Sequence, residues 1–201
     1  MNFFSGQKFW KFIAGCIRFW LGFILLTAGV AKMFNGHFIG IIGPVWLETE
    51  LEKYNLGIYA VFIAYSQIVV GFMLLVKRFA TLGAIMAIPM FANILMVTIS
   101  LHWQGTPYVV AFFLLCNLYL LVYDFYKIKF LLTDEVAPLK VIPIQRHDIR
   151  LDALYIIGLL IILVAVSLRK FLDSFAPTLA YVGLGSFVLV YAYGYWKNKR
   201  A

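Results

Sequence analysis

The sequence predicts an all-α membrane protein, with a four-helix transmembrane bundle followed by a C-terminal pair of transmembrane helices. Two observations predict this class. Hydrophobic residues make up 64% of the 201 positions and charged residues 13%, which is about half the charged share of a soluble domain. The apolar residues also fall into six long runs, and a helix needs about 20 apolar residues to cross the hydrocarbon core of a bilayer. We therefore expect six helices that cross a membrane.

The first run follows Lys8 and Lys11 and is long. Because more apolar runs follow it, we expect an uncleaved first helix and not a signal peptide. In chain order the expected spans are residues 12–31, 56–76, 80–100, 108–123, 153–168 and 179–196.

The placement of Lys and Arg predicts the orientation of these spans. Twelve of these residues fall in one alternating set of connections, which contains both termini, whereas the opposite set holds four: Lys32, Lys53, Arg169 and Lys170. Cytoplasmic loops are enriched in Lys and Arg, so both termini are expected in the cytoplasm, with the chain in the inner membrane of a bacterium. The basic residues form no tract with interleaved aromatic residues, so nucleic acid is not an expected partner of the net charge of +8.

Two connections are long enough to have structure of their own. The outer loop, 34–55, carries the acidic run Glu48, Glu50 and Glu52. It is expected to lie on the periplasmic surface of the inner membrane or to fold over the bundle. The inner loop, 125–152, contains two prolines and mixed charges. The expected division is a four-helix transmembrane unit, a cytoplasmic linker and a C-terminal transmembrane pair, which span 1–130, 131–152 and 153–201.

Polar side chains inside the apolar runs mark the candidate site, because a charge at membrane depth is costly without a partner or water. Arg18 lies in the first run, seven residues after Lys11. Asn117 lies at a similar depth in the fourth run, seven residues before Asp124. We expect Arg18 to face the bundle interior and to pair with Asp124, directly or through water, with Asn117 close by.

The second and third runs each contribute an amide, Gln67 and Asn93. Together with Asn117, these amides have two interpretations. They could hold the helices together through interhelical hydrogen bonds, or they could line an apolar slot that binds a ligand. The sequence leaves both interpretations open.

A second polar group is expected at the outer side. Lys32 could snorkel to the headgroups, or it could form a polar outer mouth with His37, Glu48 and His102. His102 and Glu48 are the candidates for proton handling there, because a histidine titrates near neutral pH. The histidines and carboxylates lack close spacing, so no metal is expected.

Three motifs carry a resemblance to a known family, namely Arg18-Phe-Trp-Leu-Gly22, Gln67-Ile-Val-Val-Gly71 and Asn117-Leu-Tyr-Leu-Leu. Together they resemble the DoxX-like family of small bacterial membrane proteins, in its Bacteroidetes-type branch. The resemblance covers residues 10–130 and excludes the last two runs. Many relatives carry a glutamate where this chain has Gln67, which puts a proton relay at that position in doubt.

This resemblance implies a function in redox chemistry. Related polypeptides are linked to a thiosulfate:quinone oxidoreductase and to membrane complexes that counter oxidative stress. The first hypothesis is therefore a membrane subunit of a redox complex, with a quinone or a small sulfur substrate held around Arg18, Gln67, Asn93 and Asn117. The second is a non-enzymatic assembly or structural subunit, and the sequence does not decide whether the chain is an enzyme. A transporter is the weakest hypothesis, because no inverted repeat is evident. The bilayer and other membrane subunits are the expected partners.

Overall fold

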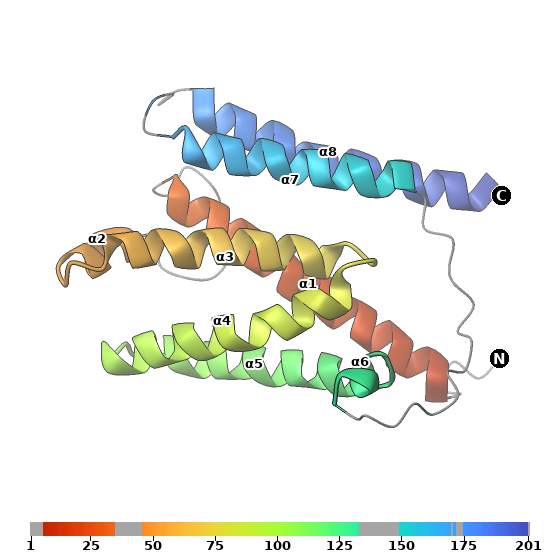
Figure 1. Ribbon diagram of the computed structural model, residues 1–201, viewed down its shortest axis with the longest axis horizontal. Helices are drawn as coiled ribbons and strands as arrows, with labels where there is room; N and C mark the ends of the chain where they lie inside the picture. Colours follow the sequence, from red (N-terminus) through yellow and green to blue (C-terminus); the bar gives the residue numbers. More distant parts are fainter. Residues whose placement is uncertain (1–5, 35–45, 133–148, 170, 172–174, 201) are drawn as a thin grey trace. The chain divides into compact units, whose positions relative to one another are not determined.

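The computed structural model is built of α-helices (Figure 1). The structure describes residues 6–34, 46–132, 149–169, 171 and 175–200. Within these ranges there are eight helices and no strand. Six of the helices are long and apolar enough to cross a membrane. The predicted all-α membrane class with six spanning helices is confirmed, while the orientation of the termini remains a prediction.

The spanning helices lie close to the six predicted runs. They are α1 (Gly6–Met33), α3 (Gly57–Leu75), α4 (Ala80–Ser100), α5 (Thr106–Tyr123), α7 (Ile149–Ser167) and α8 (Phe175–Arg200). Two short helices, α2 (Leu47–Glu52) and α6 (Phe125–Leu132), lie in the outer loop and after α5. α8 begins four residues before the predicted start, because Pro177 falls in its first turn, where a proline needs no hydrogen-bond donor.

The turn between α4 and α5 is tight and contains two left-handed residues. His102 has a φ of 53° and Gly105 a φ of 87°. Glycine adopts such angles without a steric cost, and Gly105 directly precedes α5, which has a proline in its first turn. His102 is exposed on this turn.

The chain forms two compact units. Unit 1 comprises Met1–Phe23 and Met73–Arg146, so it contains the first part of α1 with α4, α5 and α6. Unit 2 comprises Ile24–Phe72 and His147–Ala201, and it contains the rest of α1 with α2, α3, α7 and α8. The predicted segments 1–130, 131–152 and 153–201 remain predictions, and most of the expected linker lies outside the described residues.

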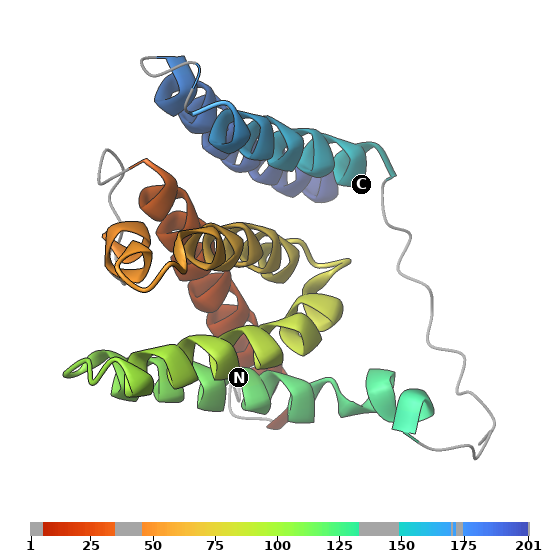
Figure 2. The same cartoon turned by 60° about the vertical axis from the view of Figure 1, so that its left-hand side comes forward.

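In unit 1, α4 and α5 lie side by side (Figures 1 and 2). Aromatic rings fill the space between them and α1: the Phe113 ring packs 5.8 Å from Trp20 and 6.1 Å from Phe91. Gly83 of α4 lies against the end of α3, where an added Cβ atom would come within 2.9 Å of the Met73 Cβ. Apolar packing therefore fixes how these helices approach one another.

In unit 2, small residues allow two close helix crossings. α7 and α8 lie side by side (Figures 1 and 2), and they cross at Gly158 and Gly183, where a Cβ atom on Gly183 would lie 2.6 Å from a carbon of Ile162. α1 crosses α3 at Gly29, where a Cβ atom would lie 2.7 Å from the Ala64 carbonyl oxygen. Such contacts are typical of membrane helices, whose backbones approach closely at small residues.

Candidate functional site

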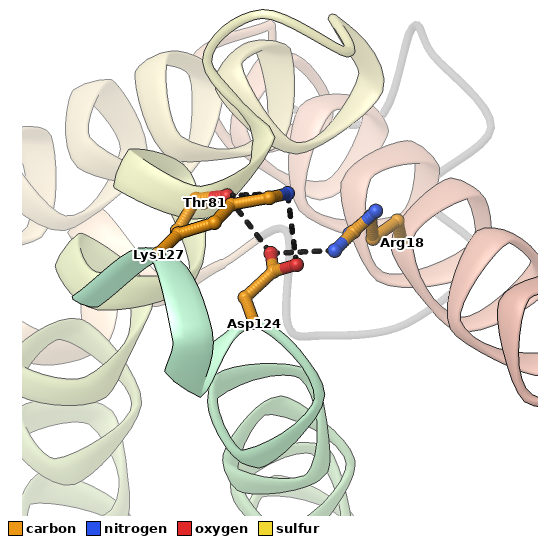
Figure 3. A network of polar contacts seen from close by, with 4 residues as sticks. All are labelled: Arg18, Thr81, Asp124 and Lys127. Carbon is orange, nitrogen blue, oxygen red and sulfur yellow. Dashed lines mark hydrogen bonds and ion pairs between the residues drawn. The ribbon is translucent and has the colours of Figure 1, made fainter. Parts of the chain in front are cut away.

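Unit 1 contains a buried carboxylate that is held by three side chains (Figure 3). The Asp124 side chain is 0% exposed, and its Oδ2 atom lies 2.5 Å from the Arg18 Nη2 atom. Thr81 donates its hydroxyl to the same oxygen at 2.8 Å, and Lys127 Nζ donates to Oδ1 at 2.9 Å. We call these four residues the Asp124 cluster. The predicted pairing of Arg18 with Asp124 is confirmed, and the contact is direct.

The local fold explains how these side chains meet. Asp124 directly follows the last residue of α5, and α6 begins with the next residue. Lys127 is therefore three residues from Asp124 in the first turn of α6 and can reach back to it. Thr81 is the second residue of α4, and Arg18 approaches from α1 with its guanidinium 5.6 Å from the Tyr123 ring centre.

The surroundings of Asp124 favour its charged form. Burial by itself raises the pKa of this carboxyl, but the hydrogen bonds from Lys127 and Thr81 and the positive charges of Arg18 and Lys127 outweigh it. The pKa of Asp124 therefore lies below its ordinary value of 3.8. The cluster holds two cations and one anion. At neutral pH the carboxylate is a fixed negative charge, and protein donors occupy both of its oxygens.

Asn117 belongs to the same interface between α4 and α5. Its side chain is fully buried, and its Nδ2 atom donates to the Ala84 carbonyl oxygen at 2.8 Å. Its Oδ1 atom has no hydrogen-bond partner among the described residues, and the same holds for Arg18 Nε and the Tyr119 hydroxyl. Buried polar atoms nearly always have a partner, so these three buried atoms retain hydrogen-bonding capacity.

The other two predicted amides lie elsewhere. Asn93 is exposed on α4, whereas Asn117 is buried. Gln67 is buried on α3 in unit 2, and its Oε1 atom has no partner within the part of the chain that the structure describes. The structure thus brings Arg18 and Asp124 into contact, and Asn117 lies in the same unit, seven residues before Asp124 in the sequence. A ligand site formed by all the predicted polar residues remains a prediction.

Within unit 2, an ion pair that the sequence did not suggest attaches α2 to the ends of α1 and α7. Arg169 Nη2 lies 2.8 Å from Glu48 Oε1 and 2.7 Å from Oε2. The Nη1 atom of the same guanidinium donates to the Met33 carbonyl oxygen at 2.8 Å, where a cation suits the end of α1. Arg169 therefore links the ends of α1 and α7 to α2.

The predicted outer mouth is divided between the units. Lys32 is 6% exposed and lies in unit 2, and its Nζ atom donates to the Ala28 carbonyl oxygen of its own helix at 3.4 Å. Its side chain turns back along α1, so the snorkelling interpretation of Lys32 is wrong. Glu48 also belongs to unit 2 and His102 to unit 1, while His37 lies outside the described residues. A proton-handling role for Glu48 and His102 remains a prediction.

Two members of the Asp124 cluster were absent from the predicted site. Lys127 could have been found from its spacing, because a cation three residues after a carboxylate is a common pair at a helix boundary. Thr81 carries no comparable signal, since a neutral hydroxyl at the start of a span has many roles. Within the described ranges, no group of three or more His, Cys, Asp or Glu side chains could hold a metal ion.

No protein-family model, curated protein or solved structure matches this chain.

Proposed function

We propose that this multi-pass membrane protein is a non-catalytic subunit of a membrane complex, in the inner membrane of a bacterium. The observation that carries the proposal is the saturation of Asp124. Two cations and one hydroxyl occupy both of its oxygens, and its side chain is fully buried. A carboxylate that accepts a proton or binds a substrate needs an accessible oxygen. The Asp124 cluster instead holds α1, α4, α5 and α6 together.

The exposed surface of the spans supports a role with partner proteins. Only 22% of the residues in the most apolar stretch of α5, and 22% of those in α8, are buried within the chain. The remaining surface is available to lipid tails and to the helices of other subunits. The resemblance to DoxX-like proteins, some of which are subunits of membrane complexes, supports the same proposal.

The test is to purify the full chain from its native membrane in a mild detergent and to analyse the intact complex by mass spectrometry. We expect another membrane protein in a fixed ratio and no bound small organic molecule. A chain that purifies alone, or one that retains a stoichiometric organic ligand, would contradict the proposal.

A second candidate function, a quinone-binding subunit of a redox complex, is favoured by the unpartnered atoms near α5. A quinone needs an apolar slot with a donor at its carbonyl oxygen. The Arg18 Nε atom and the Tyr119 hydroxyl are both buried donors without a partner among the described residues. The DoxX-like resemblance supports this candidate as well, because some relatives are linked to quinone reduction.

The variant Tyr119→Phe separates the two candidates, because it removes one hydroxyl and keeps the ring. If the chain is a scaffold, the variant keeps or slightly raises its stability, because a buried hydroxyl without a partner costs about 1–3 kcal/mol. If the site binds quinone, added ubiquinone raises the melting temperature of the wild-type protein, and the variant loses most of this shift. Tyr108→Phe is the matched control, because Tyr108 is 81% exposed.

A further inference from the structure

The positive charge of the chain is concentrated in unit 1. The sequence segments of this unit contain nine Lys and Arg against three Asp and Glu, a net charge of +6, whereas unit 2 has eight against six, a net charge of +2. One of the three acidic residues of unit 1 is Asp124, which two cations already share. Most of the net charge of +8 therefore belongs to unit 1.

Four basic residues of unit 1 lie where α4 begins and α5 ends. Lys77 and Arg78 lie in the turn before α4, and Lys127 and Lys129 lie on α6, directly after the end of α5. All four are exposed. α4 begins and α5 ends at this level, since Thr81 donates a hydrogen bond to Asp124. The four cations therefore lie where two spans leave the hydrocarbon, which is the level of the lipid headgroups.

α6 has the features of a helix that lies in the headgroup layer. It turns away from the axis of α5 (Figures 1 and 2). Its first two residues, Phe125 and Tyr126, are exposed aromatic residues, and aromatic rings are enriched at this depth. Lysines follow them at 127 and 129. Short amphipathic helices with this composition bind to anionic membrane surfaces.

Lys127 has the capacity to bind a headgroup while it remains in the Asp124 cluster. An ammonium group has three N–H donors. Lys127 uses one toward Asp124 at 2.9 Å and one toward Thr81 at 3.4 Å, and its side chain is 39% exposed. A third donor remains for an oxygen that approaches from outside.

We propose that α6 and the neighbouring basic turn bind the phosphate groups of anionic phospholipids at the membrane face where α5 ends. The lipid phosphate accepts a hydrogen bond from the remaining donor of Lys127, while Lys129, Lys77 and Arg78 add electrostatic attraction at the same membrane face. This surface is independent of whether the chain has protein partners. Its failure would therefore leave the proposed subunit function untouched.

The experiment is a lipid titration of the purified, delipidated full chain, followed by native mass spectrometry. We expect phosphatidylglycerol to bind at least tenfold more tightly than phosphatidylcholine. The double variant Lys77→Gln/Lys129→Gln should lower the phosphatidylglycerol affinity about 25-fold, because each lysine near an anionic surface contributes about fivefold. Neither residue belongs to the Asp124 cluster, so the melting temperature in detergent should fall less than in Asp124→Asn. Lys53→Gln, an exposed cation of unit 2, is the matched control.

Four results would overturn the proposal. The first is equal binding of the two lipids, and the second is an unchanged affinity in the double variant. The third is displacement of the lipid by millimolar inorganic phosphate, which would show a site for free phosphate. In the intact complex, an acidic partner protein that crosslinks to Lys129, together with no preference for phosphatidylglycerol, would likewise show that a protein occupies this surface.

Discussion

Replacing Asp124 with asparagine should lower the free energy of unfolding in detergent by about 3 kcal/mol. Asparagine keeps the size of the side chain but removes the charge. Its NH₂ group replaces one carboxylate oxygen, so it cannot accept the hydrogen bond that this oxygen receives. Arg18 then remains as a largely buried cation without its carboxylate, since its side chain is only 21% exposed. Removing one partner of such a pair is more harmful than removing both.

The magnitude follows from the three bonds to the carboxylate. The charged bond from Arg18 at 2.5 Å contributes about 2 kcal/mol, and the neutral bond from Thr81 at 2.8 Å about 1 kcal/mol. Lys127 is 39% exposed, so it can turn toward water, and its loss adds at most about 0.5 kcal/mol. The sum is dominated by Arg18.

The assay is denaturant unfolding in micelles, followed by tryptophan fluorescence, on both single variants and on the double variant Arg18→Met/Asp124→Asn. Arg18→Met alone should cost about 2 kcal/mol, because Asp124 keeps Lys127 and Thr81. The double variant should be less destabilised than the sum of the singles by about 1–2 kcal/mol. Glu52→Gln, which removes an exposed carboxylate, is the control and should change stability by less than about 0.5 kcal/mol.

The wild type and Asp124→Asn also allow a test of how stability depends on pH. The pKa of Asp124 is lower in the folded state than its ordinary value of 3.8. Its contribution to stability is therefore fully present above that value and is lost as the pH falls toward the folded pKa. The difference between wild type and Asp124→Asn should be constant from pH 7 to about 5 and should shrink below 3.8. The reasoning is refuted if Asp124→Asn unfolds like the wild type at pH 7, or if the costs in the double variant add fully.

Two further outcomes test the packing of unit 2. Gly183→Ala should lower the unfolding free energy by about 1–3 kcal/mol, because its Cβ would lie 2.6 Å from a carbon of α7. Gly185→Ala, with open space around it, should cause no loss of stability. Equal effects of the two variants in a thermal melt would refute the close crossing of α7 and α8. Glu48→Gln should speed amide exchange in α2 by about 30-fold, since the bond to Arg169 contributes about 2 kcal/mol. Glu50→Gln, which breaks only an exposed pair, should change the exchange by less than about fivefold, and similar rates in both variants would refute the attachment of α2.

The fold class and the spans could be predicted because few backbone structures are stable in the hydrocarbon core of a bilayer. Every backbone group that crosses the bilayer needs a partner within its own segment, so a long apolar run becomes a helix. The run predicted at 80–100 became α4 with the same bounds. Boundaries next to aqueous loops were less certain, as at Pro177, because there the sequence pattern permits several starting points.

The site was predictable only in part. Arg18 and Asp124 could be paired because a guanidinium below the interface has few possible partners. The pair between Arg169 and Glu48 could not be predicted, because both residues lie outside the apolar runs, where water competes and many pairings are equally favourable. The division of the chain into two compact units could not be predicted either. α1 contributes residues to both units, and the hydrophobic periodicity of a helix does not show which other helices it packs against.

The saturation of Asp124 also limits where chemistry could occur in unit 1. If Asp124 took a proton or released Arg18 during each turnover, a bond that contributes about 2 kcal/mol to the fold would break in every cycle. The bond joins residues 106 positions apart in the chain, so its loss would loosen α1 from α5. The Asn117 amide oxygen and the Tyr119 hydroxyl are buried and have no partner among the described residues. They could therefore bind a ligand without breaking a bond that stabilises the fold. A small organic ligand buried within unit 1 should therefore depend on these two side chains more than on Arg18 and Asp124.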